Sequence, residues 1–161
     1  MLKYKYNIIY EKVLKNMFSI SSVFLNKNKI PDQYGCHGED INPPLEFHEI
    51  PAGTQSLVLI VDDPDAPSGD WVHWLVFNIG PKTTSIEEHT TPKGAVVGLN
   101  SFGENAYEGP CPPSGTHNYN FKLYAINTVL SLAFTVEKSD VLAAIKGHII
   151  AQTILTGAYS K

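Results

Sequence analysis

Two long apolar runs constrain the fold of this chain more than any other feature. They read SLVLIVDD at residues 56–63 and WVHWLVFNI at 71–79. Apolar runs of this length, bounded by turn residues, predict strands that are buried on both faces. The loop between them contains Pro64, Pro67 and Gly69, which interrupt strand pairing and force a turn. We therefore expect two buried strands joined by a short loop.

The rest of the chain predicts more strands and little helix. Strands are expected at 18–25, 45–47, 95–103, 120–126 and 151–160, with polar loop at 80–95 and an irregular Pro-rich loop at 107–119. A helix is expected from Ser139 and Asp140, which offer an N-cap, through VLAAIK. This pattern predicts a mostly β fold, an antiparallel β-sandwich with one or two helices near the C-terminus.

The composition limits the classes of function. The chain has 161 residues, 43% of them hydrophobic and 17% charged, which predicts a single globular domain. Its net charge is −4 and every basic residue other than histidine is lysine, so nucleic acids and anionic membrane surfaces are poor partners. Because arginine is absent, an anion site must use His, Lys, hydroxyl or backbone N–H groups.

The N-terminal residues 1–16 differ from the rest. They are rich in lysine and are expected to be an extension, or the product of a start site upstream of a true start at Met17. Their apolar runs are too short for a signal peptide, and no run in the chain is long enough for a transmembrane segment. We therefore expect a cytoplasmic protein.

Two cysteines, Cys36 and Cys111, lie in loops rich in Gly and Pro. Two are too few for a disulfide scaffold, and no CxxC motif is present. Two reduced thiols are the favoured interpretation, with a disulfide between the loops as the alternative.

Two loops carry most of the unusual chemistry. If the adjoining strands share a sheet, these loops converge at one end of it and surround a cavity. The candidates are Asp63, Asp65, Trp71 and His73 from the first loop, and Gly109, Cys111, Pro112, His117 and Tyr119 from the second. His117 and Tyr119, two residues apart, would point to the same side of a strand.

Several of these residues also have structural interpretations. His73 lies within an apolar strand, where a satisfied core histidine is common. Asp63 and Asp65 stand beside prolines and are good turn formers. Trp74 is expected in the core. Gly109 and its proline neighbours form a rigid loop, which is also how backbone N–H groups are held toward an anion.

The motifs DDPDAP, WVHW and GPCPPSGTHNYNFKLYA, in this order, resemble the phosphatidylethanolamine-binding protein family. The likeness is closest to its bacterial and archaeal, Raf-kinase-inhibitor-like branch, and it covers residues 17–160. It implies a large antiparallel sheet with a smaller one, in a single domain over 17–161. It also implies a small anion pocket for phosphate-like or phospholipid-headgroup ligands.

The resemblance implies a set of pocket residues. These are Asp63, Asp65, Pro67, Trp71, His73, Gly109, Cys111, Pro112, His117 and Tyr119. Cys111 stands where vertebrate relatives have glycine. The vertebrate branch also has a C-terminal helix near the pocket, and this chain ends at Lys161, before such a helix.

We therefore expect a non-enzymatic binding protein without cofactor or metal. His73 and His117 would orient a phosphate-like group, with Asp65 and Tyr119 as partners, helped by N–H groups near Gly109. Binding should strengthen as the pH falls through the histidine range. The resemblance also implies a homodimer and a regulator of a kinase or protease, although no residue specifies that partner.

The alternative is an enzyme, a metal- or His/Asp-dependent hydrolase that uses the same pocket. The histidine spacing matches no short metal-binding signature, and no serine is placed beside an evident base.

Overall fold

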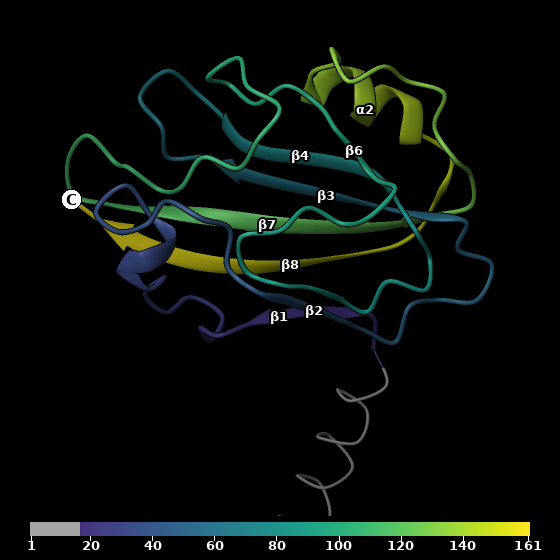
Figure 1. Ribbon diagram of the computed structural model, residues 1–161, viewed down its shortest axis with the longest axis horizontal. Coiled ribbons are helices and arrows are strands. Elements are labelled where there is room, and N and C mark those ends of the chain that lie inside the picture. Colours follow the sequence, from purple (N-terminus) through teal and green to yellow (C-terminus); the bar gives the residue numbers. More distant parts are fainter. Residues whose placement is uncertain (1–16) are drawn as a thin grey trace, which may run out of the picture.

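A five-stranded antiparallel sheet with the order β6-β4-β3-β7-β8 forms the centre of the computed structural model, which describes residues 17–161 (Figure 1). The predicted extension at 1–16 lies outside the described residues. The strands are β3 (Ser56–Asp63), β4 (Trp71–Ile79), β6 (Val96–Val97), β7 (Thr116–Ile126) and β8 (Ile149–Ser160).

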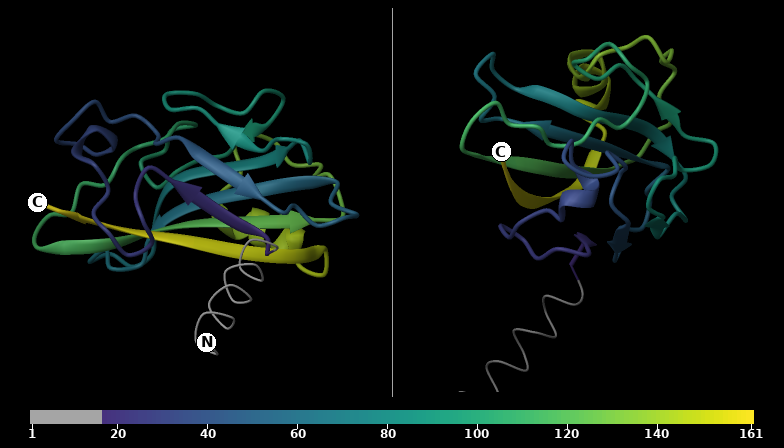
Figure 2. Two further views of the ribbon diagram at one scale, coloured as in Figure 1. Left: turned by 90° about the horizontal axis from the view of Figure 1, so that it is seen from below. Right: turned by 60° about the vertical axis from the view of Figure 1, so that its left-hand side comes forward.

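A smaller sheet packs on one face of the large sheet and a helix on the other (Figures 1 and 2). The small sheet has the order β1-β2-β5, with β1 (Ser19–Ser22), β2 (Leu45–His48) and β5 (Ser85–Ile86). The helix is α2 (Lys138–Ile145), and a short 3-10 helix, η1, spans Asp32–Tyr34. This confirms the predicted antiparallel β-sandwich with a helix near the C-terminus. No helix within 17–161 has the length and apolarity needed to cross a bilayer.

The large sheet divides the interior into two hydrophobic clusters. Leu57, Leu59 and Val61 of β3 face the small sheet, whereas Val58 and Ile60 face α2. Because successive strand residues point to opposite faces, a strand covered on both sides is apolar on both faces along most of its length. All eight residues of β3 are buried, as its continuous apolar run predicted.

Strand β7 begins earlier than predicted. The expected strand covered 120–126, but pairing with β8 starts at Thr116. Buried His117 and Tyr119 alternate with exposed Asn118, so the alternation of the strand continues into the segment interpreted as loop. The extension places His117 and Tyr119 on the sheet rather than on a loop.

Other boundaries also differ from the predictions. The N-cap of α2 is Glu137, which forms a capping box with Asp140, rather than Ser139 or Asp140. Of the segment 95–103, which was expected to be a strand, only Val96–Val97 is one, β6. The segment 80–95 was expected to be loop, but it contains the short strand β5, Ser85–Ile86. Both strands have two residues, too few for a hydrophobic pattern to be recognised.

Candidate functional site

Four of the predicted site residues form one buried cluster at an end of the large sheet. Asp63 ends β3, His73 lies on β4, and His117 and Tyr119 lie on β7. The ring of Tyr119 lies 5.2 Å from that of His73 and 6.5 Å from that of His117, measured between centroids. All four residues are buried. We call this group the His–Tyr cluster.

A β-bulge aims His73 into the cluster. In the β3–β4 ladder Val61 pairs with Trp74, but the next residue, Asp62, pairs with Val72. His73 is therefore the extra residue of β4. Bulges re-aim side chains and are common beside functional sites. Here the bulge places His73 on the same face of the sheet as Trp74, which belongs to the cluster of apolar residues facing the small sheet.

Asp63 orients His117. Its Oδ2 lies 2.7 Å from Nδ1 of His117, and both side chains are almost fully buried. The other carboxylate oxygen, Oδ1, accepts the backbone N–H of Asp65 at 2.8 Å. Asp63 therefore both forms the turn and holds the histidine, so the two interpretations of this residue apply together. Because this contact engages Nδ1, Nε2 is the remaining ring nitrogen of His117.

Asp65 has a different role from the one expected. Its Oδ2 accepts the backbone N–H and the side-chain amide of Asn118, at 2.8 and 3.0 Å. These two hydrogen bonds lower the pKa of Asp65, so its carboxyl group stays ionised near neutral pH. Asp65 secures the β3–β4 loop to β7, whereas Asp63 is the carboxylate that contacts His117.

The backbone of Glu108 determines the tautomer of His73. Nδ1 of His73 lies 2.7 Å from the carbonyl oxygen of Glu108. A carbonyl only accepts hydrogen bonds, so Nδ1 carries the proton and Nε2 of the neutral ring is an acceptor. Burial lowers the pKa of His73, although the Glu108 carbonyl and the Asp63 carboxylate partly oppose this effect. We therefore assign a neutral ring to the free protein at pH 7.

Because the pKa of His73 is lowered by folding, protonation of its ring favours the unfolded state. In the unfolded chain the pKa of histidine is about 6.5. The stability that His73 contributes should be fully present above that pH and should decrease as the pH falls below it, by at most about 1.4 kcal/mol per pH unit. We expect wild type to lose stability relative to His73→Gln between pH 7 and 5, measured by urea denaturation in phosphate-free buffer. A constant difference between the two proteins would contradict this.

The hydroxyl of Tyr119 is buried and, within the part of the chain that the structure describes, makes no hydrogen bond of normal length and geometry, although the Asp63 carboxylate and the backbone of Cys111 lie near enough to influence its pKa. Burial and the neighbouring Asp63 carboxylate raise its pKa, so the hydroxyl stays protonated. A buried donor without a partner is unfavourable by about 1–3 kcal/mol, and such groups in native proteins call for an explanation. Tyr119 therefore presents a neutral donor that a ligand oxygen can satisfy.

The loop before β7 is held against the segment that follows η1. The N–H of Gly109 donates to Oδ1 of Asp40 at 2.6 Å. A Cβ on Gly109 would lie 2.5 Å from that oxygen and from the carbonyl oxygen of Tyr34, so only glycine fits. The N–H of Gly109 is thus not free for an anion, contrary to our expectation. Since proline has no N–H, Cys111 offers the remaining N–H between 109 and 113.

Cys36 and Cys111 form a disulfide, so the prediction of two reduced thiols was wrong. Their Cα atoms are 5.4 Å apart, within the range that a disulfide spans. A hydrogen bond from the N–H of Cys36 to the carbonyl of Pro110 holds the same two loops together. The two cysteines are separated by 75 residues, and sequence spacing does not reveal which loops meet.

The remaining predicted residues surround the cluster to different degrees. Pro112 is buried behind the loop, whereas Pro67 and Cys111 are exposed. Trp71 is half-buried, and its ring meets the ring of Phe102, a residue to which sequence reasoning gave no role. Phe102 lies in the segment GLNSFG, residues 98–103. The sequence of a loop does not reveal which side chains an aromatic residue in it contacts. Within 17–161 no group of three or more His, Cys, Asp or Glu side chains is arranged to hold a metal.

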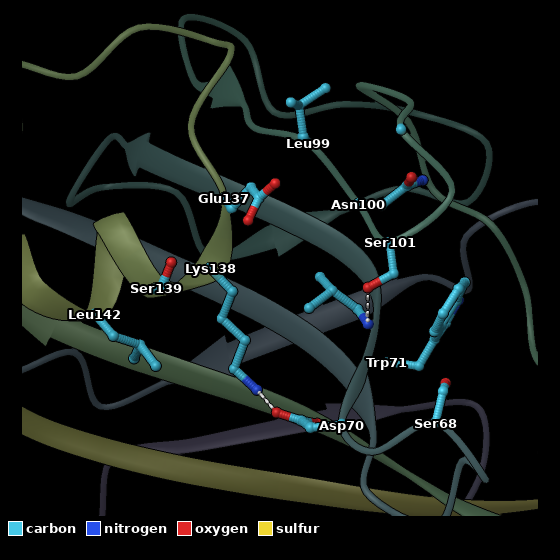
Figure 3. Close-up of a pocket in the computed structure, with 12 residues that line it drawn as sticks. Ser68, Asp70, Trp71, Leu99, Asn100, Ser101, Glu137, Lys138, Ser139 and Leu142 are labelled. Atoms are coloured by element: carbon cyan, nitrogen blue, oxygen red, sulfur yellow. Dashed lines mark hydrogen bonds and ion pairs between the residues drawn. The ribbon is translucent and has the colours of Figure 1, made fainter.

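A cleft of about 680 Å³ lies next to Trp71 (Figure 3). It runs between the β3–β4 loop, the segment 99–103 and the start of α2. Trp71 is the one predicted site residue among those that line it. Lys138 and Asp70 both line the cleft, and the side chain of Lys138 points toward Asp70, with which it is paired, as Figure 3 shows. None of the four residues of the His–Tyr cluster lines this cleft, so the cleft and the cluster are separate.

Comparison with known proteins bears on the family and the fold of this chain. The family model for phosphatidylethanolamine-binding proteins matches residues 20–160. A UPF0098 protein of Methanothermobacter thermautotrophicus is 47% identical, over 86% of this chain and 95% of its own length. The crystal structure of CT736, a putative phosphatidylethanolamine-binding protein homologue from Chlamydia trachomatis, superimposes with a TM-score of 0.87 at 43% identity, covering 91% of this chain and 99% of that one. The crystal structure of Escherichia coli YbcL, described as a new member of the mammalian PEBP family, superimposes with a TM-score of 0.83 at 29% identity. The match covers 89% of this chain and 98% of that one.

Proposed function

The chain belongs to the phosphatidylethanolamine-binding protein family, and on that premise we propose that the His–Tyr cluster binds small anions of the phosphate class. The protein would act as a binding module rather than as an enzyme. The observation that carries this proposal is the unpartnered hydroxyl of Tyr119, which lies buried between two histidine rings. An oxygen of a bound phosphate would accept that O–H.

The histidines complete a set of polar groups around the same space. Nδ1 of each ring is engaged, with Glu108 for His73 and with Asp63 for His117. Each contact leaves Nε2 as the nitrogen that can meet a ligand. A neutral Nε2 accepts a proton from a P–OH group, and a protonated one donates to a phosphate oxygen. Both arrangements place one shared proton between ring and phosphate.

The carboxylate of Asp63 belongs to the His–Tyr cluster, so phosphate binding there requires a proton between a histidine ring and the phosphate. Asp63 would repel a phosphate dianion, and a proton shared with a histidine offsets that repulsion. Phosphate esters lose their second proton near pH 6, in the range where histidine titrates. We therefore expect phosphate to bind more tightly at pH 6 than at pH 8. An affinity that does not change over this range would contradict the shared proton.

Tyr119→Phe tests the proposal directly. The substitution removes only a hydroxyl that lacks a partner in the free protein, so stability should be unchanged or higher. Phosphate affinity should fall about tenfold, since a hydrogen bond to a charged group contributes about 1.5–3 kcal/mol. The measurement is an NMR titration with inorganic phosphate that follows the imidazole signals of His73 and His117.

Tyr124→Phe is the matched control. Tyr124 lies on the same strand but packs against the cluster on the α2 side of the sheet. It should bind phosphate as wild type does. Equal affinity of Tyr119→Phe and wild type would exclude the hydroxyl as a ligand. Absence of saturable shifts in wild type would mean that the His–Tyr cluster is structural.

The broader expectations stay predictions. Inhibition of a kinase or protease and formation of a homodimer derive from the resemblance, and the cytoplasmic location derives from the sequence. The contacts that support phosphate binding lie within one chain and identify no protein partner.

A further inference from the structure

The disulfide between Cys36 and Cys111 exposes its two halves unequally. Cys111 is exposed, although the prolines on either side of it are buried, whereas Cys36 is half-buried. A thiolate must reach a sulfur atom in order to attack it, so accessible disulfides are the ones that exchange with thiols. Cys111 is therefore the half of this disulfide that a thiol in solution can reach.

The backbone of Cys111 lies at the His–Tyr cluster. Burial raises the pKa of Tyr119, and the backbone of Cys111, which lies close to the Tyr119 hydroxyl, opposes this effect. The strand that carries His117 and Tyr119 begins at Thr116, shortly after Cys111. A displacement of Cys111 would therefore change both the surroundings of the Tyr119 hydroxyl and the chain that leads into these two site residues.

The disulfide holds the part of the loop that is nearest to the cluster. Three hydrogen bonds join 107–110 to the segment 34–40 independently of the sulfur atoms. Within residues 17–161, the two hydrogen bonds of normal geometry to 111–115 both come from Lys161, the last residue of the chain. Opening the disulfide would thus leave 107–110 in place and release 111–115, the segment that leads into β7.

We propose that the disulfide is a site of reversible thiol–disulfide exchange, attacked at Cys111, and that the disulfide-bonded form binds phosphate more tightly than the reduced form. The co-reactant is a thiol in its thiolate form. The first part stands on the exposure of Cys111. The second part rests on the proposed function, since it concerns phosphate at the His–Tyr cluster.

The exchange takes place in two steps. A thiolate attacks Sγ of Cys111, so that a new S–S bond forms there while the bond to Cys36 breaks and the Cys36 sulfur leaves as a thiolate. A second thiolate attacks the thiol-derived sulfur of this mixed disulfide, which frees Cys111 and releases the oxidised thiol as a disulfide. Two electrons pass from the two thiols to the protein, and the two cysteine thiolates take up protons near neutral pH. A small-molecule disulfide reverses both steps.

Reaction with reduced glutathione tests which sulfur is attacked. After a brief reaction the free thiols are trapped with N-ethylmaleimide, and the digested peptides are mapped by mass spectrometry. We expect glutathione on Cys111 and maleimide on Cys36. The urea-unfolded protein is the control, because both sulfurs are then accessible and either should be modified. Glutathione on Cys36, or on both cysteines equally in the folded protein, would contradict attack at Cys111.

Titration of the oxidised and the reduced protein with inorganic phosphate, followed by the histidine NMR signals, tests the effect on the site. We expect binding to be about fivefold weaker in dithiothreitol, since the release of Cys111 weakens one polar contact around the ligand. By thermodynamic linkage, saturating phosphate should lower the equilibrium constant for reduction by the same factor. Cys36→Ser combined with Cys111→Ser is the control variant. It should bind as reduced wild type does, with or without dithiothreitol.

Two results would overturn the effect of reduction on the site while leaving the proposed function intact. One is equal phosphate affinity in the oxidised and the reduced protein. The other is loss of the native NMR spectrum on reduction, which would make the disulfide a requirement for folding. If the oxidised protein does not bind phosphate, the proposed function fails and the effect on affinity fails with it. The peptide mapping still decides in that case whether Cys111 is the attacked sulfur.

Discussion

Replacing Cys36 and Cys111 together by serine is expected to lower the free energy of unfolding by about 4 kcal/mol, because their disulfide closes a loop across a separation of 75 residues. A cross-link over so long a loop removes many conformations from the unfolded chain. Chemical denaturation without reductant, compared between wild type and the double variant, measures the difference.

The reduced wild-type protein is the natural control. In dithiothreitol it should unfold at the same denaturant concentration as the double variant, and the double variant should not respond to the reductant. We also expect phosphate binding to weaken, because the disulfide holds the loop that precedes His117 and Tyr119. A difference in stability below about 1 kcal/mol would contradict a stabilising disulfide.

Asp62→Asn is the second substitution with a large expected effect, a loss of about 3 kcal/mol in the free energy of unfolding. The Asp62 side chain is fully buried, and its Oδ2 lies 2.6 Å from Nζ of both Lys122 and Lys138. Burial alone lowers the pKa of Lys138, but its hydrogen bonds to Asp62 and Asp70 outweigh burial and raise it. Without the Asp62 charge, two partly buried ammonium groups lose their shared partner.

Asp70→Asn is the matched control for this substitution. Asp70 pairs with the same Lys138, but 46% of its side chain is exposed. Exposed ion pairs contribute at most about 1 kcal/mol, so this variant should stay close to wild type in thermal and chemical denaturation. Equal losses in the two variants would show that burial of Asp62 is not what makes its ion pairs important.

The sequence by itself determined the central strands. β3 and β4 have the predicted bounds, 56–63 and 71–79, because each is a long, mostly apolar run that is bounded by turn residues. The helix near the C-terminus followed from its helix-forming residues, although its N-cap is Glu137 rather than the residues expected. These signals are local, since each depends on residues adjacent in the chain.

The family resemblance predicted which site residues belong together, which hydrophobic periodicity alone could not do. It grouped His73 with His117 and Tyr119, and the structure places their rings together. It did not tell Asp63 from Asp65, which stand on either side of one proline. Which carboxylate reaches His117 depends on the end of β3 and on the start of β7, and sequence reasoning began β7 too late.

Only the tertiary structure decided the remaining features of the site. The bulge at His73 arises from the register between two strands, and the disulfide from the meeting of two loops distant in sequence. The contact of Phe102 with Trp71 and His73 depends on how a third loop folds over β4. The hydrophobic pattern of a single segment predicts its burial. The register between two strands and the contacts between two loops depend on both segments, so a local pattern does not reveal them. For that reason the sequence determined the two central strands, and the fold decided which residues meet at the site.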